Sequence, residues 1–139
     1  MSRIFLDTDV VIDFLTKREP FSGDIMKIFQ LGSKKNITLA ISSLSISNVY
    51  YIVSKIETTQ KALEKIKVLL QIIEVLNVDA EVIHQAINSG FKDFEDAIQH
   101  YCAKKAQIDL IITRNTKDYK ASELAILTPS EFVVKYDFT

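Results

Sequence analysis

The segment that decides the fold is Ile4-Phe5-Leu6-Asp7-Thr8-Asp9-Val10-Val11-Ile12-Asp13, close to the start of the chain. Its first three residues are apolar, too few for a helix and rich in strand formers, so we predict a buried strand over 4–6. Acidic residues follow where this strand ends. Ligands of open α/β sheets bind beyond the carboxyl ends of the strands, so Asp7 and Asp9 stand where such a fold keeps its chemistry.

Outward from this segment, short apolar runs alternate with amphipathic ones. Further strands are predicted over 37–41, within 72–78, over 110–112 and over 125–127. Helices are predicted over 9–15, 22–31, 43–53, 59–70, 79–87, 93–106 and 130–136, and their candidate caps are Asp9, Ser22, Ser43, Thr58 or Thr59, Asp79, Asp93 and Ser130. This order predicts the α/β class, with a mostly parallel sheet covered by helices on both faces.

The overall composition excludes several classes of protein. A chain of 139 residues, 47% apolar, suits a single domain over 1–139. A net charge of -1 argues against a protein that coats duplexes through phosphate neutralisation, but permits an enzyme with a local basic rim. The lone Cys102 excludes an internal disulfide, and no apolar run approaches membrane-spanning length, so we expect a cytoplasmic protein without a membrane partner.

Three groups of acids can meet at one edge of the predicted sheet. Asp7 follows the first strand, Asp93 and Asp96 open the helix before the strand over 110–112, and Asp118 follows that strand. The helix joins this edge only if the loop before it crosses there. Carboxylates held close together raise one another's pKa, and a divalent cation relieves that repulsion. Oxygen ligands suit a hard ion, Mg²⁺ or Mn²⁺, which can support hydrolysis of a nucleic-acid backbone.

The same acids could instead have purely structural roles, without taking part in catalysis. Asp9 and Asp93 suit helix caps, and Asp118 suits a turn. Asp13 is expected at the surface or beside the site. Arg114 could contact phosphate, although scattered basic residues are usually solvated.

Three segments, 6–10, 93–97 and 113–119, resemble the signature segments of PIN-domain nucleases, in the family's order. They read Leu-Asp-Thr-Asp-Val, Asp-Phe-Glu-Asp-Ala and Thr-Arg-Asn-Thr-Lys-Asp-Tyr. The resemblance covers nearly the whole chain and implies a three-layer α/β/α sandwich with a Mg²⁺ or Mn²⁺ site and endoribonuclease activity on RNA. Small bacterial members that it resembles are toxins of toxin–antitoxin pairs, so it also implies an antitoxin partner and a homodimer.

Residue by residue, the resemblance implies catalytic roles for Asp7, Asp96 and Asp118. It implies the same three as metal ligands, with Asp93 beside them. Thr113 matches the family's hydroxyl residue after the fourth strand, and Asp9 would orient Asp7.

Two amides depart from the family pattern. Asn48 stands where a Glu is common, and Asn115 stands where an Asp is common. Each keeps an oxygen but loses a charge, so metal affinity should fall. With Asp9, Thr113 and Arg114, these amides are predicted to support the metal ligands or contact the substrate.

Two other functions fit parts of the pattern. The amides permit a catalytically weak PIN-like module that binds RNA or a protein partner. The opening Asp7-Thr8-Asp9-Val10 is also similar to haloacid-dehalogenase-type phosphatases, in which Asp7 would be the nucleophile and Asp9 the acid/base, although no cap domain is evident.

Overall fold

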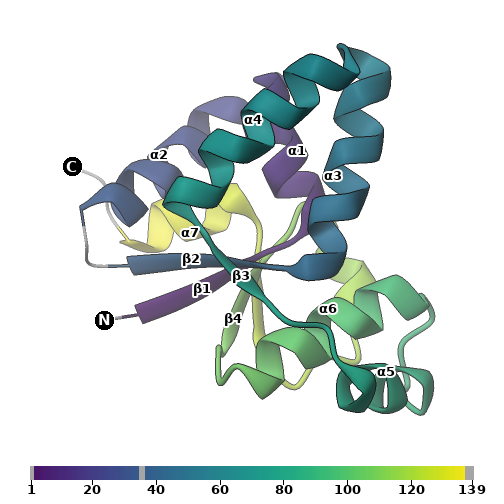
Figure 1. Ribbon diagram of the computed structural model, residues 1–139. Helices are drawn as coiled ribbons and strands as arrows, with labels where there is room; N and C mark the ends of the chain where they lie inside the picture. Colours follow the sequence, from purple (N-terminus) through teal and green to yellow (C-terminus); the bar gives the residue numbers. More distant parts are fainter. Residues whose placement is uncertain (1, 35–36, 137–139) are drawn as a thin grey trace.

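The protein is described by a computed structural model over residues 2–34 and 37–136, and a five-stranded sheet lies at its centre (Figure 1). The strands are β1 (Ser2–Leu6), β2 (Ile37–Ser42), β3 (Glu74–Leu76), β4 (Leu110–Ile112) and β5 (Ala125–Leu127). Their order is β3-β2-β1-β4-β5, and every neighbouring pair is parallel. The predicted fold class is therefore confirmed.

The register of the central strand brings the first acid to the edge where β4 ends. Leu6 pairs with Ile112, the last residues of β1 and β4. The ladder continues one step further, because the Asp7 N–H donates to the Ile112 carbonyl at 2.9 Å. Thr113 continues β4 in the same way and donates its N–H to Leu127 at 3.0 Å. Asp7 and Thr113 thus leave adjacent strands side by side.

Helices cover the two faces of the sheet unequally (Figure 1). One face carries α1 (Thr8–Thr16), α2 (Ser22–Ser33), α3 (Ser43–Ile56), α4 (Thr59–Ile72) and α7 (Pro129–Tyr136). The other carries α5 (Ala80–Ile87) and α6 (Phe94–Lys105), with the short 3₁₀ helix η1 (Thr116–Tyr119). Successive side chains of β1 point to opposite faces of the sheet, so Ile4 and Leu6 pack against the first layer of helices and Phe5 packs against the second. Within the described ranges, no helix is long and apolar enough to cross a membrane.

Several predicted caps are correct and explain why their helices begin where they do. Thr58, Asp79 and Asp93 each accept a hydrogen bond from a backbone N–H of the first turn. The cap of α6 matters most for function, because Asp93 Oδ1 accepts from the Asp96 N–H at 3.0 Å. It thereby fixes the helix end that presents Asp96.

Other predicted caps are wrong by one or two residues. Helix α1 is capped by Asp7 and not by Asp9, because the strand ends early enough for Asp7 to accept from the Thr8 N–H. Helix α3 is capped by Ser42 instead of Ser43. At α7, Thr128 and Glu131 accept from each other's backbone N–H groups, which replaces the predicted cap Ser130.

One further cap differs from the prediction. Helix α2 begins at Ser22, and the preceding Phe21 makes no side-chain cap, so Ser22 is not the cap. The strand predicted within 72–78 is confirmed as Glu74–Leu76, which starts after the end of α4 at Ile72.

Candidate active site

Asp7 is a buried carboxylate held by hydrogen bonds from three sides. Its Oδ1 accepts from the Thr8 N–H at 2.7 Å, while Oδ2 accepts from Thr113 Oγ1 at 2.9 Å and from the Tyr119 hydroxyl at 3.1 Å. Its exposure is 8%. Burial raises the pKa of Asp7, the three donors lower it, and the charge of Asp118 raises it further. The carboxylate is therefore fixed in orientation and short of neutralising charge.

Asp96 and Asp118 bring their negative charges close to Asp7, as the sequence predicted. Burial raises the pKa of Asp96 to about 7, and repulsion from Asp7, then Asp93, Asp118 and Glu95, adds to it. The loop before α6 lines one cleft together with Asp96 and Asp118, so the start of α6 lies at this edge. Asp118 is exposed on η1, and its N–H donates to the Asn115 carbonyl at 3.0 Å.

Asp9 faces the segment after β4 instead of capping α1. Its Oδ2 accepts from the Arg114 N–H at 3.3 Å and from Asn115 Nδ2 at 3.4 Å, and Thr113 Oγ1 lies 3.5 Å away. Burial, then repulsion from Asp7, raises the pKa of Asp9 to about 7. Its Oδ1 is buried without a hydrogen-bond donor among the described residues. This oxygen is therefore a free acceptor that a proton or a cation could occupy.

Arg114 forms an ion pair with a buried acid. Its Nε lies 2.6 Å from Oδ2 of Asp13, whose side chain is fully buried, and its guanidinium lies 4.5 Å from the ring centroid of Phe21. Of the two expected places for Asp13, the surface is therefore wrong and the place beside the site is correct, because this inward-facing side chain pairs with Arg114 of the cleft. The pair fixes the 113–115 segment against α1.

Asn48 lies at the rim of the site on α3. Its Nδ2 donates to Glu95 Oε1 at 2.6 Å. Burial raises the pKa of Glu95, and the charges of Asp93 and Asp7 raise it further. This amide, which stands in place of an acid, thus binds an acid of α6, so a carboxylate remains next to this position.

A buried polar network lies beneath the carboxylates and was not predicted. Gln99, one turn after Asp96 on α6, donates from Nε2 to Thr8 Oγ1 at 3.0 Å and to Ser45 Oγ at 2.8 Å. Its Oε1 accepts from Ser42 Oγ at 2.5 Å, and Thr8 and Ser45 share a further bond of 2.8 Å. The network joins the starts of α1 and α3 to α6, and so sets the separation of Asp7 and Asp96.

Sequence reasoning also missed Tyr119, which donates to Asp7 from η1. Burial raises the pKa of Tyr119, and the charge of Asp7 adds to it, so the hydroxyl remains a donor. A buried aromatic directly after Asp118 was the available signal for Tyr119. For Gln99 the signal was a polar residue among the inward-facing positions of 94–106.

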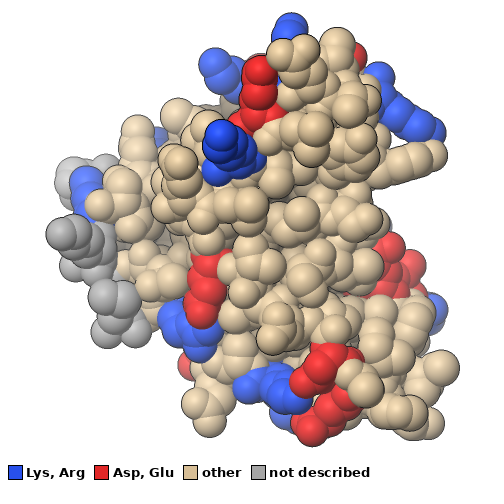
Figure 2. Space-filling model, in the orientation of Figure 1, with Lys and Arg blue, Asp and Glu red and all other residues tan. Residues whose placement is uncertain are grey.

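Two clefts meet at the carboxylates. The central cleft, about 330 Å³, is lined by residues 7–9, Ile12, Arg18, Ile52, Ile56, Asp96, Arg114, Asn115 and Asp118. The second, the lysine cleft, is about 300 Å³ and is lined by residues 90–93, Asp96, Lys117, Asp118, Lys120 and Ala121. Asp96 and Asp118 line both. Figure 2 shows acidic side chains gathered at the right-hand edge of the molecule, below α3.

The donor set fits a hard divalent cation by chemistry, although its side chains are still spread apart. Over residues 2–34 and 37–136, no three His, Cys, Asp or Glu side chains lie close enough together to hold a metal ion. Asp7, Asp9, Asp96 and Asp118 nevertheless line one cleft, and Asp9 Oδ1 has no donor among the described residues. The available ligands are oxygens, which Mg²⁺ and Mn²⁺ prefer.

Fold and site together define an α/β domain with an acidic pocket at the carboxyl edge of a parallel sheet. The chain belongs to the PIN domain family, whose family description matches residues 3–117. The resemblance seen in the sequence is therefore confirmed. The match includes Asp7, Asp96 and Thr113 and ends one residue before Asp118.

Known proteins resemble the chain over most of its length. Ribonuclease VapC1 of Aquifex aeolicus (strain VF5) is 29% identical over 140 residues, which is 97% of this chain and 96% of that protein. The crystal structure of VapBC2 from Rickettsia felis bound to a promoter DNA fragment aligns with a TM-score of 0.70 at 19% identity, covering 89% of this chain and 96% of the other. VapC20 of Mycobacterium tuberculosis, a Sarcin-Ricin loop cleaving toxin, aligns with a TM-score of 0.63 at 16% identity, covering 78% and 86%.

Proposed function

We propose that the protein is a metal-dependent endoribonuclease that hydrolyses RNA phosphodiester bonds as the toxin of a toxin–antitoxin pair. The observation that carries this proposal is the convergence of Asp7, Asp96 and Asp118 on one cleft at the carboxyl edge of the sheet. Membership of the PIN domain family and the full-length likeness to a ribonuclease support the choice of RNA as substrate.

The roles of the site residues follow from their contacts. Asp7, Asp96 and Asp118 would hold a divalent cation, with Asp93 nearby, although one oxygen of Asp93 is occupied as a helix cap. Such a cation, Mg²⁺ or Mn²⁺, supplies a water of lowered pKa and stabilises charge on the phosphate.

The neighbouring groups position these carboxylates. Thr113 and Tyr119 orient Asp7 by donating to its Oδ2, and Gln99 sets the spacing of α1 and α6. Asp9, through its buried Oδ1, is suited to accept a proton or a cation-bound water. Asn115 holds Asp9 in place through its amide.

Two contacts weaken the alternatives. Asn48 binds Glu95 and so keeps a carboxylate at the rim, which favours an active site over a module that only binds. The three donors hold the Asp7 carboxylate in one orientation, which suits a fixed ligand better than a nucleophile that has to attack phosphorus.

An antitoxin protein and a homodimer are part of the proposal. The Rickettsia felis relative was crystallised as VapBC2 bound to promoter DNA. Other similar structures are a toxin–antitoxin complex from Klebsiella pneumoniae and DNA-bound VapBC from Salmonella typhimurium. The proposal also includes a cytoplasmic location, where such a toxin has access to RNA.

The test is cleavage of single-stranded and structured RNA by the purified chain with Mg²⁺, with Mn²⁺ and with chelator. Cleavage should require the divalent ion and disappear in Asp7→Asn and Asp96→Asn. The matched control is Asp109→Asn, which removes an exposed carboxylate just before β4, at the other end of that strand. Cleavage that persists in chelator, or in both site variants, would overturn the proposal.

A further inference from the structure

The lysine cleft carries unpaired positive charge directly beside the acids. Lys92, Lys117 and Lys120 line it, and all three are exposed. Lys92 precedes the cap of α6, whereas Lys117 and Lys120 come from η1 and the residue after it. Three lysines from two segments therefore converge on one hollow of about 300 Å³, at the lower end of the range for small-ligand pockets.

These lysines do not neutralise the acids that share their cleft. Among the described residues, the ion pairs of lysine involve Lys65, Lys104 and Lys105 only. Lys92, Lys117 and Lys120 therefore lie more than 4 Å from every described carboxylate oxygen, including those of Asp96 and Asp118. Their charge remains available to an anion.

The other side of the carboxylates offers less to a polyanion. The central cleft has two cations, Arg18 and Arg114, and Arg114 is held by the buried Asp13. Much of the rest of that side is apolar, from Ile52 and Ile56 of α3. A strand that crosses the carboxylates thus meets its phosphate-binding groups mainly on the side of η1.

We propose that the lysine cleft binds the phosphodiester backbone of the RNA strand on one side of the scissile bond, through Lys92, Lys117 and Lys120. The inference deepens the proposed ribonuclease function and rests on it. The cleft is shared with Asp96 and Asp118, so a phosphate within it lies next to the bond that the carboxylates would attack. A chain whose net charge is -1 needs such a local basic surface to hold a polyanion against its own acids.

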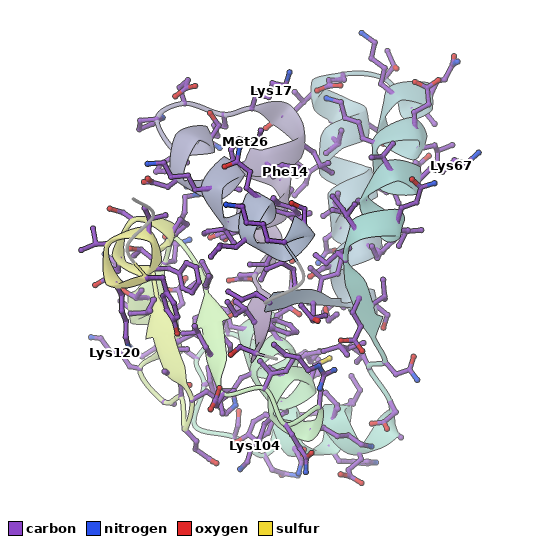
Figure 3. All side chains as sticks on the ribbon, turned by 90° about the vertical axis from the view of Figure 1, so that its left-hand side faces the viewer. Phe14, Lys17, Met26, Lys67, Lys104 and Lys120 are labelled. Atoms are coloured by element: carbon purple, nitrogen blue, oxygen red, sulfur yellow. The ribbon has the colours of Figure 1, made fainter. Side chains whose placement is uncertain are left out.

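The experiment measures RNA binding without cleavage. All proteins carry Asp7→Asn, and the probe is a short fluorescein-labelled single-stranded RNA in Mg²⁺, followed by fluorescence anisotropy over a series of salt concentrations. The test variant replaces Lys92, Lys117 and Lys120 with Gln. The control variant replaces Lys27, Lys61 and Lys67 with Gln, three exposed lysines of α2 and α4, and Figure 3 shows Lys67 and Lys120 on opposite sides of the molecule.

Each lost phosphate contact should lower the slope of log affinity against log salt by about 0.7, so the triple variant should lose about 2 in slope. At about 0.1 M salt this corresponds to a roughly 100-fold higher Kd, with the control close to the parent. A DNA probe of the same sequence should show the same loss, because lysine–phosphate contacts do not read the 2′-hydroxyl. Melting curves by circular dichroism verify that both variants fold.

Equal Kd and equal slope in the test variant and its parent would overturn the inference, as would an equal loss in the control. If the proposed ribonuclease function is wrong, the result is a different one: the native chain leaves RNA intact with Mg²⁺ and with Mn²⁺. A loss seen with RNA and absent with DNA would also overturn it, since recognition would then rest on the sugar.

Discussion

Asp96→Asn should make the metal-free protein more stable at pH 8, because it removes one charge from a crowded cluster. The pKa of Asp96 is raised from its ordinary 3.8 to about 7. Between these values the folded protein binds more protons than the unfolded chain, so its free energy of unfolding falls as the pH rises through that window. The amide of Asp96→Asn does not titrate, so the variant does not lose this part of its free energy of unfolding.

The raised pKa would by itself correspond to at most roughly 4 kcal/mol above pH 7. Asp96 is only half-buried, so solvent screening reduces this to about 1–2 kcal/mol. For a domain of this size, that change raises Tm by roughly 3–7 °C. At pH 4 the difference should be smaller, because the native Asp96 is then largely protonated and neutral.

The assay is thermal unfolding in chelator and in Mg²⁺, at pH 4 and pH 8, for the native chain, Asp96→Asn and the control Asp109→Asn. At pH 8 Mg²⁺ should stabilise the native chain by about 3 kcal/mol at 100-fold excess over Kd, and should stabilise Asp96→Asn far less. A variant less stable than the native chain at pH 8 in chelator would refute the electrostatic reasoning. A full Mg²⁺ effect in Asp96→Asn would refute its role as a ligand.

Three further substitutions test the supporting contacts. Gln99→Met should lower the free energy of unfolding by about 2–3 kcal/mol in urea titrations, because it leaves buried hydroxyls without partners, and should raise the Mg²⁺ concentration for half-maximal cleavage. Tyr119→Phe removes a donor that lowers the pKa of Asp7, so the acid limb of the pH–rate profile should move to higher pH. Arg114→Met should cost about 3–5 kcal/mol in the same titrations by leaving Asp13 charged and unpaired, and adding Asp13→Asn should recover part of that loss.

Matched controls separate these effects from general damage. Gln85→Met and Tyr50→Phe alter exposed side chains of α5 and α3 and should change stability by less than about 0.5 kcal/mol. Equal stability of Gln99→Met and Gln85→Met would contradict the network. An unmoved pH profile in Tyr119→Phe, or an Arg114→Met protein as stable as the native chain, would contradict the other two.

The fold was predictable because strand and helix periodicities are strong in this chain. Buried strands such as 4–6 and 110–112 stand alone as apolar runs, and right-handed crossovers then leave little choice of arrangement. The caps were harder. Asp7 and Asp9 are both suitable residues two positions apart, and only the length of the strand decides between them.

The carboxylates of the site could be predicted from the sequence, whereas the groups that hold them in place could not. Asp7, Asp96 and Asp118 follow from strand ends and a helix start, which are local features of the sequence. Gln99 and Tyr119 act through contacts across the sheet, and their partners depend on register and helix rotation. The assignment of the carboxylates as metal ligands stays a prediction.

The contacts of Asp7 have a consequence for the order in which the protein becomes competent. Its donors Thr113 and Tyr119 lie 106 and 112 residues further along the chain. During synthesis the first carboxylate therefore emerges well before the groups that orient it, and such distant pairings form slowly. A nascent or truncated chain has the acid without the assembled site. The oriented carboxylate therefore exists only after the segment through Tyr119 has folded against the end of β1.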